Sequence, residues 1–243
     1  FGFDGAILFS DILMVPWALG QELTFGAGEG PRLAPALVDS ALESLSPDVT
    51  RLDPVYATVR RVAAALPAQT TVLGFGAIID AIITTTVHYL IAQIDAGVAA
   101  VQIFDSWAGS LSPEQFERWV IAPNRAIVDR VRARCPDTPI IGFPKGAGGK
   151  LAAYAAGTAV DAIGLDETVD PHWANAVLPP ELPVQGNLDP LALLTGGAAL
   201  DAGIDRVLAA FPERPHIFNL GHGIGQHTPI AHVEQLLQRV RGE

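Results

Sequence analysis

The run 139–143 (PIIGF) carries no charge and is followed by Pro144 and the cation Lys145. Short, largely apolar runs of this kind recur along the chain, and each closes on polar or glycine residues. They occupy residues 6–9, 71–75, 100–104, 139–143, 162–165, 183–186 and 216–220. Apolar runs of four or five residues are typical of strands that are buried on both faces. The sequence therefore predicts seven buried strands.

Helical patterns separate most of these runs. Apolar residues recur in them at helical spacing, and residues that start or stop helices stand at their ends. The expected helices begin at Ile78, at Pro113 behind the capping residue Ser112, and at Pro229 behind the capping residue Thr228, with a stop at Gly97 and a kink at Pro123.

Strands that alternate with helices predict a parallel sheet. Seven or eight such strands in 243 residues favour an α/β fold of the (β/α)8 TIM barrel type, with residues 1–243 as a single domain. An open doubly wound sheet is the structural alternative. The eighth strand has only two weak candidates, at 31–37 and at 49–52.

Composition limits the partners and the compartment. The formal net charge of −11 argues against nucleic acid or an anionic membrane as the main partner, because both attract basic surfaces. An anionic small-molecule substrate is not excluded, because a local basic pocket can lie in an acidic protein. The single cysteine, Cys135, excludes an internal disulfide and a cysteine-based zinc site, which fits a cytoplasmic protein. No apolar run is long enough to span a membrane, and no signal peptide is apparent.

Candidate functional residues stand directly after the predicted strands, because parallel barrels carry their active sites at the carboxyl ends of the strands. Asp11 lies in a very apolar stretch, and is either a functional acid or the cap of a helix. Ser106 is expected to be a binding or capping hydroxyl, since it lacks the spacing of a nucleophile elbow. Lys145 is a candidate for binding an anion. His222 lies between glycines that would let a ligand approach, or is a turn histidine.

Other chemistries find little support. The glycines at 146–149 follow neither the P-loop nor the dinucleotide-binding pattern. The histidines and Cys135 form no recognisable set of metal ligands, so no metal or cofactor is expected. We expect His227 to lie in a surface loop and His232 to face solvent from the last helix.

Six short blocks of the sequence resemble the uroporphyrinogen decarboxylase family. They follow one another in the family's order and cover nearly the whole chain. The blocks are 9–13 (FSDIL), 102–109 (QIFDSWAG), 142–146 (GFPKG), 164–166 (GLD), 185–190 (QGNLDP) and 219–223 (NLGHG). Each block alone would be a weak signal, but six in order are specific.

The resemblance implies a (β/α)8 barrel that is usually a homodimer. It implies an enzyme that removes carbon dioxide from the four acetate groups of uroporphyrinogen III to give coproporphyrinogen III in tetrapyrrole synthesis, without cofactor or metal. The residue matching Asp11 is implied to accept the pyrrole N–H groups and to stabilise positive charge. The residues matching Ser106 and His222 are implied to bind the substrate's carboxylates or the rim of its macrocycle. The resemblance further implies that Lys145 contacts a substrate carboxylate and that Phe75 lines the active-site cleft.

The sequence departs from the family's pattern in two places. An arginine-rich N-terminal segment is missing, and after Phe75 the chain runs directly into a later helix of the family, without the loop that carries a functional tyrosine. We expect the full protein to contain both segments. Two alternatives remain: a corrinoid-linked methyltransferase of the same superfamily, for which the zinc ligands are lacking, and a non-catalytic tetrapyrrole-binding protein.

Overall fold

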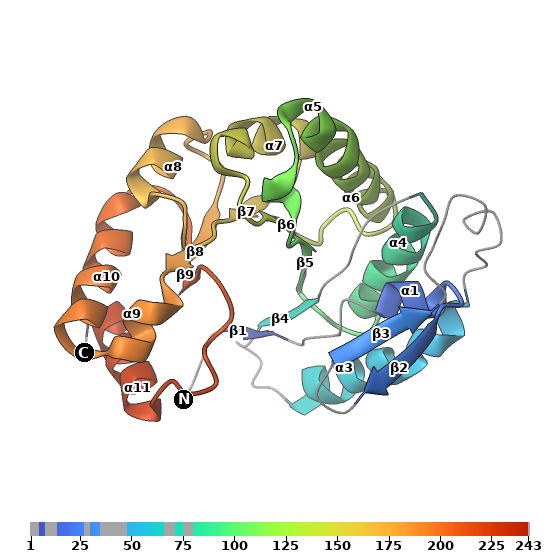
Figure 1. The fold of residues 1–243 in the computed structure, drawn as a ribbon, viewed down its shortest axis with the longest axis horizontal. Helices are drawn as coiled ribbons and strands as arrows, with labels where there is room; N and C mark the ends of the chain where they lie inside the picture. The colour runs from blue at the N-terminus through green and yellow to red at the C-terminus, as the bar shows by residue number, and fades with distance from the viewer. Residues whose placement is uncertain are drawn as a thin grey trace. The chain divides into compact units, whose positions relative to one another are not determined.

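The computed structural model, drawn in Figure 1, describes residues 5–7, 14–26, 30–34, 48–65, 71–74 and 80–242. Seven of the strands in these ranges belong to one sheet, in the order β1-β4-β5-β6-β7-β8-β9, and every pair of neighbours whose register is described is parallel. Their bounds are β1 Gly5–Ile7, β4 Thr71–Gly74, β5 Ala100–Asp105, β6 Ile140–Pro144, β7 Ala162–Gly164, β8 Val184–Leu188 and β9 His216–Leu220. All seven predicted strands are therefore confirmed.

Helices lie between successive strands of this sheet, so the parallel α/β fold class is confirmed. The α-helices are α1 Met14–Ala18, α3 Asp53–Ala65, α4 Asp80–Asp95, α5 Pro113–Phe116, α6 Ala122–Arg134, α7 Leu151–Thr158, α8 Pro171–Val177, α9 Pro190–Thr195, α10 Gly197–Ala210 and α11 Ile230–Arg241. Short turns of 3-10 helix are η1 Val49–Leu52, η2 Ala108–Ser110 and η4 Gly148–Lys150, and η3 Glu117–Ile121 is a π-helical turn.

Neither candidate for an eighth parallel strand is one. Within 31–37, the described residues belong to β3 (Gly30–Ala34), which pairs with β2 (Glu22–Gly26) in a separate antiparallel hairpin. Sequence neighbours can form such a hairpin through a short connection, whereas parallel partners need a long crossover. The other candidate is η1, whose backbone N–H at Thr50 donates to the Asp48 carboxylate at 3.2 Å. The eighth strand and the closure of a barrel stay predictions.

The helix expected from Pro113 is divided into α5, η3 and α6. Ser112 caps its start as predicted, since its hydroxyl accepts a hydrogen bond from the Gln115 N–H at 3.4 Å. Pro123 lies in the first turn of α6, directly after the π turn. Proline lacks the N–H that an uninterrupted helix would use, and the π turn accommodates that loss. A change of helix type therefore precedes Pro123, and the kink itself stays a prediction.

The ends of two other helices test the capping predictions. Gly97 follows α4 with a φ of 110°, a left-handed conformation that stops a helix, as predicted. The last helix begins one residue later than expected, because Pro229 and not Thr228 occupies the capping position of α11. The expected start at Ile78 lies outside the described residues.

The chain divides into two compact units, each with its own apolar cluster. One unit comprises Gly2–Phe104 and Arg118–Ile140, and its cluster contains Ala18, Leu52, Tyr56 and Tyr89. The other comprises Asp105–Glu117 and Ile141–Glu243, where Leu188, Leu193, Leu200 and Ile204 are buried together. In the latter, α10 contacts β8, α9 and α11 (Figure 1). The assignment of residues 1–243 to one domain stays a prediction.

Candidate active site

Three of the five predicted site residues lie in the described part of the chain, and all three belong to the unit that contains β6–β9. Ser106 follows β5, Lys145 follows β6 and His222 stands two residues beyond β9. Ser106 and His222 are exposed, and Lys145 is partly buried. Asp11 and Phe75 lie outside the described residues.

Backbone contacts bring the ends of β5 and β6 together. The N–H of Lys145 donates to the Asp105 carbonyl, and the N–H of Gly109 donates to the Lys145 carbonyl, both at 3.0 Å. A Cβ atom at Gly109 would lie 2.5 Å from the Gly146 carbonyl oxygen, so only glycine permits this approach. The loop that carries Ser106 is therefore fixed against the strand end that carries Lys145.

Asp105 has a structural role at this point. Its carboxylate accepts a hydrogen bond from the Trp107 N–H at 3.2 Å, which closes a tight turn around Ser106. Burial raises the pKa of Asp105, while the turn's N–H groups act in the opposite direction. Asp105 therefore caps this turn.

Asp166 joins the ends of β6 and β7. Its side chain is 2 % exposed, and one carboxylate oxygen accepts a hydrogen bond from the Gly146 N–H at 2.7 Å. The other oxygen accepts from the backbone N–H of Thr168 at 2.9 Å and from its hydroxyl. A buried carboxylate needs such donors. Asp166 therefore holds in place the loop that follows Lys145.

Glu167 is the acidic neighbour of Lys145. The Lys145 Nζ lies 3.9 Å from the Glu167 Oε1, and the two side chains are 26 % and 25 % exposed. The other carboxylate oxygen, Oε2, is buried and has no hydrogen-bond partner among the residues that the structure describes. The lysine is thus paired loosely, at the long end of the range for ion pairs.

Residues at the ends of β8 and β9 contact the loop 166–169, which follows β7. The Asn187 amide donates to the carbonyls of Asp166 at 2.9 Å and Val169 at 2.7 Å. Gly221 donates its N–H to Leu188, and a Cβ atom on Gly221 would overlap the Glu167 backbone nitrogen. His222 follows directly. The glycines beside His222 predict room for a ligand, but Gly221 allows two loops to approach each other closely, and of the two only Gly223 has open space around it.

Two further histidine predictions have opposite outcomes. His227 is exposed, as expected of a loop residue. His232 was wrongly expected to face solvent. It is partly buried in α11, where its Nδ1 lies 2.9 Å from the Leu193 carbonyl oxygen and its ring packs over Gly196. The last helix uses this histidine to attach to α9.

No metal centre emerges in the ranges that the structure describes, where no group of three or more His, Cys, Asp or Glu side chains could hold an ion. Cys135 is a buried free thiol at the C-cap of α6. Among the described helices, none has the length and apolar character that crossing a membrane requires.

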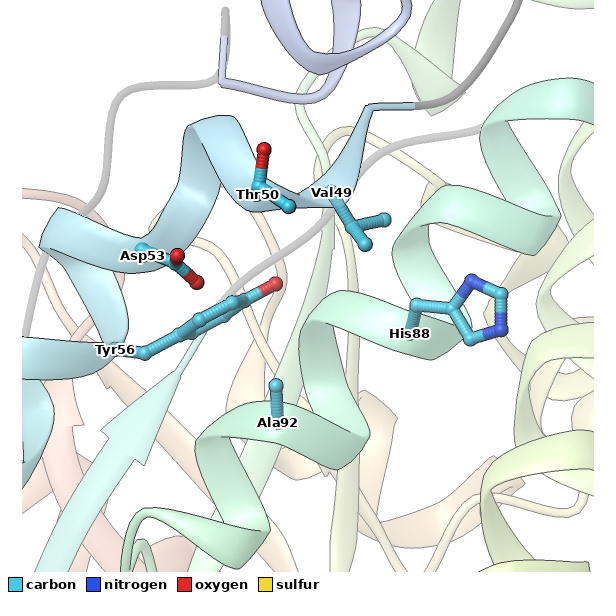
Figure 2. A pocket seen from close by; sticks show the side chains of 6 residues that line it. All are labelled: Val49, Thr50, Asp53, Tyr56, His88 and Ala92. Atoms are coloured by element: carbon cyan, nitrogen blue, oxygen red, sulfur yellow. The ribbon is translucent and has the colours of Figure 1, made fainter.

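A small pocket of about 240 Å³ lies in the other unit, between η1–α3 and α4 (Figure 2). Its lining residues are Val49, Thr50, Asp53, Tyr56, His88 and Ala92. Burial raises the pKa of Tyr56 to about 12, so its phenol stays neutral at physiological pH. This pocket contains none of the predicted site residues.

The fold and the strand-end cluster together define a class of protein. A parallel α/β sheet with a lysine, a hydroxyl and a histidine directly after its strands has the layout of an α/β enzyme, whose functional residues lie at the carboxyl ends of the strands. A model of the uroporphyrinogen decarboxylase (URO-D) family matches residues 1–77 and 75–242. The chain belongs to the uroporphyrinogen decarboxylase family.

Similar proteins agree with this assignment. A uroporphyrinogen decarboxylase of Sphingopyxis alaskensis is 66 % identical over 276 residues, covering all of this chain and 81 % of that protein. One from Rhizorhabdus wittichii is 60 % identical, with 100 % and 80 % covered. Among solved structures, a methyltransferase from Methanosarcina mazei has a TM-score of 0.78 over 99 % of this chain and 81 % of its own, at 15 % identity. That likeness concerns the fold alone.

The family match is interrupted directly after β4. Its two segments meet at residues 75–77, and the span aligned with the Sphingopyxis protein is 276 residues long, against 243 residues in this chain. The relative therefore has residues within the aligned span that this chain lacks. The junction falls at Phe75, where the sequence departs from the family's pattern.

Proposed function

We propose that this protein decarboxylates the four acetate side chains of uroporphyrinogen III and so yields coproporphyrinogen III. The observation that carries the proposal is the family match over residues 1–77 and 75–242, together with 66 % identity to a uroporphyrinogen decarboxylase across the whole chain. The proposed reaction uses no metal or organic cofactor. Its place is tetrapyrrole synthesis in the cytoplasm.

Each step replaces a carboxylate by a proton. The pyrrole ring first takes up a proton, the acetate arm then loses carbon dioxide, and the electron pair of the broken C–C bond enters the protonated ring. The exocyclic methylene carbon takes up a second proton to become a methyl group, and the ring gives its own proton back. Positive charge on the pyrrole is the electron sink. In this proposal the Asp11 carboxylate accepts hydrogen bonds from the pyrrole N–H groups and stabilises that positive charge. Phe75 lines the cleft beside the substrate.

The described strand ends supply the proposed contacts to the substrate's carboxylates. The Lys145 ammonium is the cation of this cluster, and its backbone is fixed on one side by Asp105 and on the other by Gly109. Ser106 offers a hydroxyl from a tight turn, and His222 extends an exposed imidazole from the loop after β9. Fixed backbones favour binding, because less conformational freedom is lost when the ligand arrives.

Assembly and partners belong to the same proposal. We infer a homodimer from the family, and no nucleic-acid partner from the net charge of −11. Light scattering on the purified protein measures its oligomeric state directly, and a monomer mass would contradict the homodimer.

An intact mass of the natural protein tests whether the expected additional segments exist. A mass equal to that of the 243-residue chain would exclude them.

Turnover of uroporphyrinogen III under anaerobic conditions tests the activity. After oxidation, chromatography separates the substrate, with eight carboxylates, from products with seven to four, and coproporphyrin is the expected end product. Asp11→Ala should abolish turnover. Asp205→Asn, which alters an exposed aspartate on α10 paired with Arg239, is the matched control and should retain it. Tetrapyrrole binding without any coproporphyrin would instead indicate a non-catalytic binding protein.

A further inference from the structure

The distance between Lys145 and Glu167 leaves the ammonium available to a ligand. At 3.9 Å the two groups attract each other without sharing a hydrogen bond. In the described ranges the Lys145 side chain has no hydrogen-bond acceptor, although about three quarters of it is buried. An ammonium has three donors to place. A carboxylate that entered this site would therefore find open donors and a nearby like charge.

Glu167 is held where it opposes such a ligand. Gly221 packs directly on its backbone nitrogen, and the preceding residue, Asp166, is fixed through Gly146 and Thr168. The buried Oε2 has no described partner, and leaving a buried carboxylate oxygen unpaired costs free energy. The Glu167 carboxylate therefore keeps an open acceptor beside Lys145.

Resting on the function proposed above, we propose that Glu167 is a specificity-determining residue that weakens the hold of Lys145 on the carboxylates of substrate and product. The product keeps the carboxylates of its propionate arms, so an unopposed ammonium would bind it nearly as well as the substrate. A neighbouring carboxylate partly neutralises the ammonium and repels the ligand's charge. Glu167 thereby promotes the release of coproporphyrinogen.

Replacing Glu167 by glutamine keeps the side-chain volume and removes the negative charge. Coproporphyrin III, the stable oxidised form of the product, should then bind about tenfold more tightly at low salt. An effect of this order is expected when a partly exposed negative charge 3.9 Å from the Lys145 ammonium is removed. The gain should shrink as salt screens the charges. In turnover, KM should fall together with kcat, because product leaves more slowly.

A double-mutant cycle isolates this effect. Dissociation constants for coproporphyrin III are measured by fluorescence titration of the parent, Glu167→Gln, Lys145→Gln and the double variant. Glu167→Gln should tighten binding in the parent and have less than a twofold effect once Lys145 is replaced. Glu213→Gln, which alters an exposed glutamate of the same unit, is the matched control and should leave binding unchanged.

The outcomes separate this inference from the proposed function. Equal effects of Glu167→Gln with and without Lys145, or no effect in either background, would overturn the inference while binding itself persists. A parent protein that neither binds coproporphyrin III nor forms it would overturn the proposed function as well. If circular dichroism shows that Glu167→Gln is unfolded, Glu167→Asp replaces it. The shorter carboxylate lies farther from Lys145 and should give a smaller gain of the same sign.

Discussion

Replacing the buried arginine Arg214 should destabilise the protein strongly. Its side chain is 8 % exposed and stands just before β9. The guanidinium donates to the Asn175 side chain at 2.7 Å, to the Leu182 carbonyl at 2.7 Å and to the Leu178 carbonyl at 3.0 Å, and also bonds the Asn175 and Pro179 carbonyls. One side chain thus holds the end of α8 and the turn that leads into β8.

The magnitude follows from what Arg214→Met leaves behind. A hydrogen bond to a charged group contributes about 1.5–3 kcal/mol, but bonds from one guanidinium are not additive. Of the residues whose carbonyls Arg214 bonds, Pro179 is exposed, and a freed carbonyl at the surface can bond water instead. We therefore expect a loss of about 3–5 kcal/mol in the free energy of unfolding. Arg214→Lys should lose about half of that, because an ammonium has three donors and no planar fork.

Urea unfolding followed by circular dichroism measures this loss. With a slope of about 3 kcal/mol per molar urea for a chain of this size, the midpoint of Arg214→Met should fall by about 1–1.7 M. The matched control is Arg206→Met, which removes an exposed arginine paired with Asp170 at 2.8 Å and should hardly move the midpoint. Equal midpoints for the two variants would refute the argument that hydrogen bonding by buried Arg214 decides stability here.

Three further expectations concern single residues. Gly221→Ala should lower turnover at least tenfold while the chain stays folded by circular dichroism, because the new Cβ displaces the loop that carries His222. Burial lowers the pKa of His216 below its ordinary 6.5, so the unfolded chain binds more protons and stability falls as the pH drops below that value; His216→Gln should flatten this dependence in urea unfolding at two pH values. Burial also raises the pKa of the Cys135 thiol, so Ellman's reagent should react slowly with the native protein and release one equivalent of chromophore rapidly in urea.

The sheet could be predicted because its signal is local. A parallel strand covered on both faces must be apolar over its length, and each of the seven runs became a strand with ends within two residues of the prediction wherever the structure describes them. The run 216–220 coincides with β9. Polar residues after each run then marked the edge where a site belongs.

Elements that depend on pairing partners could not be predicted in the same way. The sequence of β3 is compatible with a parallel or an antiparallel neighbour, and only its register with β2 shows which was formed. The helix after Pro113 gave a correct cap, but a proline inside a helical pattern does not tell whether the chain kinks or changes to a π turn. Both choices are made by tertiary packing.

Within the candidate site, the sequence identifies which residues follow the strands, but it does not show which hydrogen bonds and ion pairs they form. Asp166 and Asn187 follow or end strands, and their roles come from partners about twenty residues away. These partners are the Gly146 N–H for Asp166, and the Asp166 and Val169 carbonyls for Asn187. Glu167 was one more acid on that edge until its distance to Lys145 was known. No periodicity or motif encodes such pairs, so they become visible only in the fold.

Electrostatics limits how such a site can bind its proposed substrate. The chain has a net charge of −11, and uroporphyrinogen carries eight carboxylates, so the long-range field opposes their encounter. Binding must therefore come from short-range contacts that outweigh this repulsion. In the described strand ends Lys145 is the cation of the cluster, and Glu167 opposes part of its charge.

The interruption of the family match after β4 lies at the carboxyl end of a strand of the same parallel sheet, the edge at which this fold presents its functional residues. Measuring binding and turnover separately is thus informative: the ends of β5–β9 should govern coproporphyrin affinity, while Asp11 and the region after Phe75 should govern decarboxylation.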